Sequence, residues 1–189
     1  MATPGYSHLS QFISELGASQ SAYELPVRFL GFLPAGVSLL AFCYFAYKRL
    51  PKSTLTSLAL IALAIYALGY VVAAFFPCDL GCRPAQPSVS QAIHNLIGGL
   101  GYLAAPGFLF ALAQSSRSWP ASASLPAVGF LAAAISLLGL LSLSPVSPFV
   151  GLSQRAIEAS VLGWCLACGW YLRTQPGIAA KRNRPEPPR

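Results

Sequence analysis

The chain alternates between long apolar runs and short polar segments. Five runs carry almost no charge, and they cover residues 29–47, 53–76, 91–114, 121–143 and 156–172. About 20 consecutive apolar residues cross the hydrocarbon core of a bilayer, and the backbone of such a segment must satisfy its own polar groups. The pattern therefore predicts an all-α fold, a polytopic transmembrane bundle of five helical spans.

Composition supports a membrane location. Of the 189 residues, 55% are hydrophobic and 9% are charged, and the mean hydropathy is +0.60. A soluble domain carries about 25% charged residues, so this chain lacks the charge needed to cover a surface exposed to water. The alternating polarity of a transmembrane β-barrel is also missing.

The distribution of Lys and Arg predicts the orientation. Basic residues favour the cytoplasmic ends of spans, and most of them follow the first, third and fifth runs: Lys48, Arg49, Lys52, Arg117, Arg173, Lys181, Arg182, Arg184 and Arg189. We therefore expect a multi-pass inner-membrane protein with its N-terminus outside and its C-terminus in the cytoplasm. This distribution also explains the net charge of +7, so nucleic-acid binding is not indicated.

This topology divides the chain into three parts. Residues 1–27 form an extracytoplasmic interfacial segment, residues 28–173 the membrane domain, and residues 174–189 a basic, proline-rich tail that is expected to be disordered. Within the first part, Leu9, Phe12, Ile13 and Leu16 share one face of a short amphipathic helix. Such a helix is suited to lying in the interface or covering the mouth of the bundle.

The stretch FPCDLGC, residues 76–82, follows the second run on the predicted outer side. Disulfides persist outside the cytoplasm, so a Cys78–Cys82 bridge is the favoured reading. Free thiols, or a metal held by these cysteines with Asp79 and His94, are the alternatives. The remaining cysteines, Cys43, Cys165 and Cys168, lie inside spans and are expected to pack in the core.

Several polar side chains are predicted to meet at the outer face. The cluster comprises Ser14, Glu15, Asp79, His94, Arg155 and Glu158. Arg155 and Glu158 are three residues apart, so they can pair on one helix face, and ionisable groups within a span are functional candidates by default. We also expect Glu15 and Asp79 to approach His94, directly or through water.

Four motifs in order resemble a bacterial family called domain of unknown function 998. They are YSHLSQFISELGA, FPCDLGC, HN at the start of the third run and GLSQR before the fifth, and the resemblance covers about residues 5–173. The resemblance implies a membrane protein of about six helices with no settled activity. It also places motif positions at Ser14, Glu15, Leu16, Gly17, Phe76, Pro77, Asp79 and His94.

The chain departs from that family at its start. Family members usually carry a further helix before the first motif, whereas Met1 stands only a few residues upstream of it. The resemblance therefore implies either a shortened start or a partner subunit in the vacant position.

Two functions remain open from the sequence. The favoured one is a non-enzymatic accessory subunit or a module that binds lipid or a protein partner, with membrane lipids around it and no cofactor. The alternative is a hydrolase-like or metal-dependent enzyme at the outer leaflet. Its catalytic residues are not identified by any motif, and the candidates are Glu15, Asp79 and His94.

Overall fold

The computed structural model describes residues 5–174, and this part of the chain contains helices and no strand. Helix α1 (Glu24–Val27) continues through one π-helical turn (Arg28–Phe32) into α2 (Leu33–Arg49). The other helices are α3 (Thr54–Phe75), α4 (Val89–Ser116), α5 (Leu125–Leu141) and α6 (Val150–Thr174). Two short 3-10 turns, Ile13–Gly17 and Leu80–Cys82, complete the fold. The all-α prediction is confirmed.

Serine side chains fix the starts of two of these helices. Ser53 accepts a hydrogen bond from Thr56 N at 3.0 Å, and Ser88 accepts one from Gln91 N at 3.1 Å. Both serines are therefore N-caps, which satisfy backbone donors that a helix leaves unpaired. Helix α6 begins six residues before the predicted fifth run, because its first turns are polar and the apolar pattern misses them.

Three helical segments are long and apolar enough to cross a membrane within the described residues: Glu24–Arg49, Thr54–Phe75 and Val89–Ser116. Helix α5 is apolar but has 17 residues, so it extends about 26 Å. Helix α6 has 25 residues but carries Arg155, Glu158 and Arg173. Leucines on these two helices are nevertheless exposed, among them Leu138 and Leu166, as expected for a surface that faces lipid.

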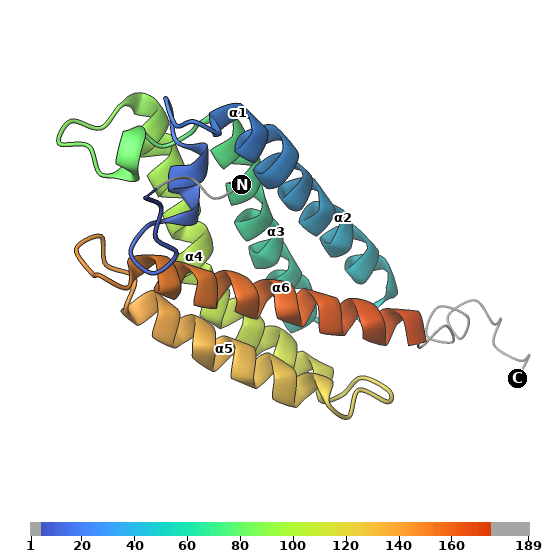
Figure 1. The fold of residues 1–189 in the computed structure, drawn as a ribbon. Helices are drawn as coiled ribbons and strands as arrows, with labels where there is room; N and C mark the ends of the chain where they lie inside the picture. The colour runs from blue at the N-terminus through green and yellow to red at the C-terminus, as the bar shows by residue number, and fades with distance from the viewer. Residues whose placement is uncertain (1–4, 175–189) are drawn as a thin grey trace, which may run out of the picture.

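Consecutive helices pack against one another, and α6 also contacts α2 and α4. In Figure 1, α5 and α6 lie side by side, and the start of α6 lies at the same end of the bundle as the N-terminal segment and the α3–α4 loop. The core where the helices meet contains Leu63, Leu109, Leu112, Ile157 and Trp164, all almost fully buried. The buried Cys43, Cys165 and Cys168 confirm the expectation that these thiols pack in the core.

Two predictions for the ends of the chain have different outcomes. Residues 8–17 do not form the expected amphipathic α-helix, because only Ile13–Gly17 is helical, and it is a 3-10 turn. The predicted disordered tail lies outside the described residues, apart from Thr174 at the end of α6.

Helix α5 approaches its neighbours closely at Gly129. A β-carbon there would lie 2.7 Å from Ala113 Cβ on α4 and 2.9 Å from Trp164 Nε1 on α6. By contrast, a β-carbon at Gly163 would meet no atom within 4 Å. Only the first glycine is therefore required by packing, as is common where membrane helices touch.

We expect Gly129→Ala to lower the free energy of unfolding by about 1–3 kcal/mol, because overpacked interiors must shift backbone atoms. Thermal unfolding of the purified protein in a neutral detergent measures the change. Gly163→Ala is the matched control and should be neutral or slightly stabilising, since alanine favours helices over glycine. Equal melting temperatures for the two variants would contradict the close packing of α5.

Candidate functional site: a capped cavity with a buried carboxylate

Residues 5–23, here called the N-terminal cap, are docked on the first turns of α6. Leu152 N donates to Leu9 O at 3.0 Å. A β-carbon at Gly151 would lie 2.3 Å from Gln11 O and 2.7 Å from His8 O. The start of α6 therefore lies directly against the cap backbone, and any side chain at Gly151 would displace it.

Arg155 fixes the cap through its guanidinium group. It donates to His8 O at 2.9 Å, to Gln11 O at 3.2 Å and to the Tyr6 hydroxyl at 2.7 Å. Burial raises the pKa of Tyr6, and the hydrogen bond and positive charge of Arg155 partly offset that rise. The predicted Arg155–Glu158 pair is wrong: Arg155 points outward to the cap, whereas Glu158 points into the bundle.

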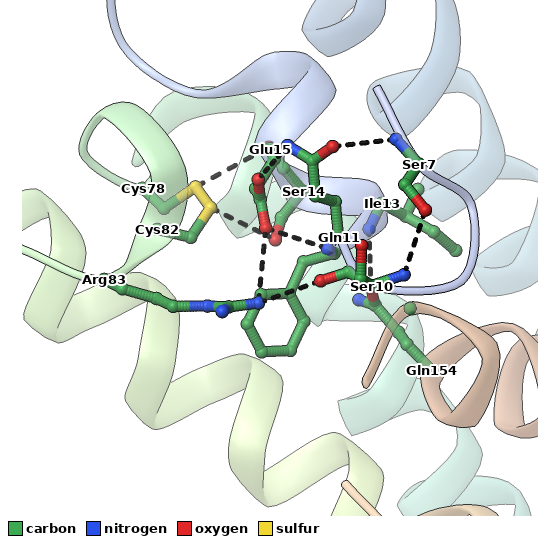
Figure 2. A network of polar contacts seen from close by, with 12 residues as sticks. Ser7, Ser10, Gln11, Ile13, Ser14, Glu15, Cys78, Cys82, Arg83 and Gln154 are labelled. Atoms are coloured by element: carbon green, nitrogen blue, oxygen red, sulfur yellow. Dashed lines mark hydrogen bonds and ion pairs between the residues drawn. A yellow bond between two sulfur atoms is a disulfide. The ribbon is translucent and has the colours of Figure 1, made fainter. Parts of the chain in front are cut away.

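Glu15 holds the cap together internally. Its carboxylate accepts hydrogen bonds from Gln11 Nε2 at 2.8 Å and from Phe12 N at 2.9 Å. Arg83 Nη2 lies 3.8 Å from Glu15 Oε1 and donates to Ser10 O at 3.1 Å. Figure 2 shows these contacts joining the cap to the α3–α4 loop. They explain why the cap is ordered without forming a regular helix.

The α3–α4 loop contains the predicted disulfide, Cys78–Cys82. Because the two sulfur atoms are bonded to each other, neither is a free thiol or a metal ligand in this structure. The loop also contacts the cap: Ser19 N donates to Cys78 O at 2.8 Å, and Ser14 Oγ lies 3.4 Å from Cys82 Sγ. The disulfide therefore closes the loop that contacts the cap, and Figure 2 shows it beside Ser14.

Asp79 and His94 are near this loop but make separate contacts. The backbone N–H and the hydroxyl of Ser88 both donate to the Asp79 carboxylate, and these bonds lower its pKa. His94 Nδ1 lies 3.0 Å from Phe76 O. The expected direct hydrogen bonds between His94 and Glu15 or Asp79 are not formed, since each carboxylate is bound by other donors.

The Glu158 carboxylate is buried where three helices meet. Its side chain accepts hydrogen bonds from the hydroxyls of Tyr66 and Tyr70 on α3, and from the Tyr102 hydroxyl on α4 at 2.6 Å. Glu158 itself is 8% exposed. One carboxylate thus joins three helices, and we call this group the Glu158–tyrosine hub.

Gln154 connects the hub to the cap. Lying one turn before Glu158 on α6, it donates to the Tyr102 hydroxyl at 2.6 Å through Nε2. Its Oε1 accepts a hydrogen bond from Ile13 N at 2.6 Å. A continuous chain of hydrogen bonds therefore runs from the cap backbone to the buried carboxylate.

A cavity of about 330 Å³ lies between the cap and the hub. Its walls are mainly aromatic, aliphatic and glycine residues, with Glu158, the tyrosines and Gln154 supplying polar groups. Asn95 and Gly99, one turn apart on α4, are exposed residues of its lining. A β-carbon on Gly98 or Gly99 would meet no atom within 4 Å, so these glycines leave space open. The other lining residues are Phe12, Ile13, Ser14, Phe32, Gly69, Ala73, Cys82, His94, Gly101, Leu143 and Pro145.

The structure therefore divides the predicted polar cluster. Ser14, His94 and Glu158 line the cavity, whereas Glu15, Asp79 and Arg155 stabilise the cap and the loop around it. Sequence reasoning missed Tyr66, Tyr70, Tyr102 and Gln154. The available signal was a pair of tyrosines four residues apart in an otherwise apolar run, which places both on one helix face.

The geometry does not favour the hydrolase-like alternative. A nucleophile should hydrogen-bond a base, which in turn should bond an orienting group. Within residues 5–174, neither histidine side chain hydrogen-bonds a serine hydroxyl or a carboxylate, and no group of three His, Cys, Asp or Glu side chains is placed to hold a metal ion. The arrangement instead provides a cavity with largely apolar walls and a buried carboxylate.

Comparison with known proteins identifies a family and nothing more specific. The family model described as "Protein of unknown function (DUF998)" matches residues 1–171. No curated protein and no solved structure matches the chain significantly.

The disulfide predicts a simple count of reactive thiols. The chain has five cysteines, and Cys43, Cys165 and Cys168 are free. Protein unfolded without reductant should take up three maleimide labels by mass spectrometry, rising to five after reduction. Cys43→Ser should lower both numbers by one. Five labels without reduction, in protein kept oxidised throughout, would show that the bridge is not formed.

Proposed function

The chain belongs to the family described as protein of unknown function (DUF998), and we propose that it is a membrane binding module for an amphiphilic, lipid-like ligand. The ligand occupies the cavity beneath the N-terminal cap. This proposal makes the chain a non-enzymatic module, and its central observation is a space that is largely apolar along its walls and polar at Glu158.

The size and lining of the cavity support a ligand-binding role. Pockets for small molecules commonly measure about 300–1,000 Å³ and combine apolar walls with a few fixed polar groups. The volume of about 330 Å³ lies at the lower end, so it suits a short amphiphile or one part of a lipid. Phe12 and Phe32 provide apolar contact, and the hub provides polar contact.

The cap supports the same proposal because it is anchored at both sides of the cavity. Arg155 and Gln154 bind it to α6, and the disulfide loop contacts it through Ser14 and Ser19. Such a rigid cover pre-organises a binding site, which reduces the entropy lost when a ligand binds.

We place the module in the inner membrane, with the cap on the extracytoplasmic side. The excess of Lys and Arg at the ends opposite to the cap supports this orientation, and the disulfide fits the oxidising compartment.

Vesicles test the orientation. In sealed, right-side-out vesicles, a reductant that cannot cross the membrane should open the disulfide, and a maleimide that cannot cross it should then label Cys78 and Cys82. Labelling of this pair only in inverted vesicles would reverse the orientation.

Gly98→Leu tests whether the cavity holds a ligand. The new side chain projects into open space that lines the cavity, so it should lower ligand occupancy about tenfold or more, equivalent to about 1.4 kcal/mol. Native mass spectrometry of protein extracted from its membrane should detect a bound small molecule in the wild type and lose it in this variant.

Gly107→Leu is the matched control. It lies on the same helix, also has no atom within 4 Å of its added β-carbon, and does not line the cavity. It should retain the ligand, and both variants should have similar melting temperatures. Equal occupancy in Gly98→Leu would contradict the proposal, and a co-purifying protein without any small molecule would favour the accessory-subunit alternative.

A further inference from the structure

The cavity has an unbalanced charge. Among the described residues that line it, Glu158 is the only carboxylate, and none is Lys or Arg. Within the described residues, Glu158 takes part in no ion pair and contacts only tyrosine hydroxyls. A buried carboxylate is costly unless an opposite charge or several hydrogen bonds compensate it.

The basic residues at this end of the bundle are engaged elsewhere. Arg155 donates to the cap backbone and Tyr6, and Arg83 contacts Ser10 and Glu15. Arg28 forms its ion pair with Glu24 and donates to Ala74 O. None of these guanidinium groups is directed at the cavity. Among the described residues, the Glu158 carboxylate therefore has no positively charged partner there.

The hub keeps Glu158 available to a ligand. An ionised carboxylate offers about four lone-pair sites, and the tyrosine hydroxyls occupy three of them. Tyr66, Tyr70 and Tyr102 also line the cavity with their rings in edge-to-face pairs. Aromatic rings attract alkylammonium and quaternary ammonium groups, which adds to the attraction of the carboxylate.

From this arrangement we infer that the cavity selects a ligand with a positively charged ammonium group on an apolar chain, and that the ammonium sits against Glu158. The inference rests on the proposed function and specifies its ligand class. Of the described lining residues, His94 alone can carry a positive charge, and its Nδ1 is held at Phe76 O. Anionic amphiphiles should therefore be disfavoured.

A series of amphiphiles with the same chain tests the charge preference. Octyltrimethylammonium, octanol and octanoate are titrated into the purified full-length protein in maltoside micelles, and binding is followed by calorimetry. We expect the ammonium compound to bind about tenfold more tightly than octanol, and octanoate to bind most weakly. Octanol or octanoate binding as tightly as the ammonium compound would overturn the inference.

Variants locate the preference at Glu158. Glu158→Gln keeps the size of the side chain and an acceptor for the tyrosines but removes the charge, so it should lose the preference for the ammonium compound over octanol. Gly107→Leu lies outside the cavity lining, so it should retain the preference. If Glu158→Gln does not fold, the wild-type series still decides the question, because equal binding of octanol and the ammonium compound would overturn the inference.

Gly98→Leu separates failure of this inference from failure of the proposed function. If no compound binds the wild type better than Gly98→Leu, the cavity takes no ligand and both proposals fail. If octanol binds in the cavity but charge has no effect, only the inference fails. Displacement of octyltrimethylammonium by lysophosphatidylethanolamine would show that the ammonium belongs to a lipid headgroup. If this lipid does not compete, the ligand is a free amphiphilic amine.

Discussion

The buried carboxylate of Glu158 is the constraint on which the half of this bundle beneath the cap depends. A charged side chain inside a largely apolar helix bundle needs several donors or a counter-charge. Tyrosine hydroxyls from α3 and α4 meet this need, and in doing so they bring α3, α4 and α6 to one point. The floor of the cavity, the position of Gln154 and the placement of the cap all follow from that convergence.

The cap and the loop beside it cover this polar point and form the upper walls of the cavity. Neighbouring residues of α6 have different tasks: Arg155 binds the cap from outside, whereas Gln154 links the cap to the hub from inside. The disulfide loop supports the other flank. Two of the residues that first suggest chemistry, Glu15 and Asp79, therefore have structural roles. Several cavity residues, such as Tyr66, Tyr70 and Gly98, appear ordinary in the sequence.

The sequence was most informative where one helix alone decides the outcome. Runs of apolar residues located α3 and α4 to within a few residues, and the spacing of Cys78 and Cys82 on the predicted outer side favoured their bridge. The sequence was least informative where the outcome depends on which face of one helix packs against the next. Tyr66 and Tyr70 resemble core residues, and their role depends on which face of α3 meets Glu158. Similarly, the spacing of Arg155 and Glu158 allows a pair, but docking of the cap draws Arg155 away from the bundle.

The central claim is that Glu158 faces the ligand as a charged group. Infrared difference spectroscopy tests it most directly, with Glu158→Gln used to identify the bands of this side chain. Addition of octyltrimethylammonium to the wild type should change the carboxylate band of Glu158, with an ionised carboxylate in the bound state. A Glu158 band that is unchanged by saturating ligand, or one from a protonated carboxyl group in the complex, would contradict the account.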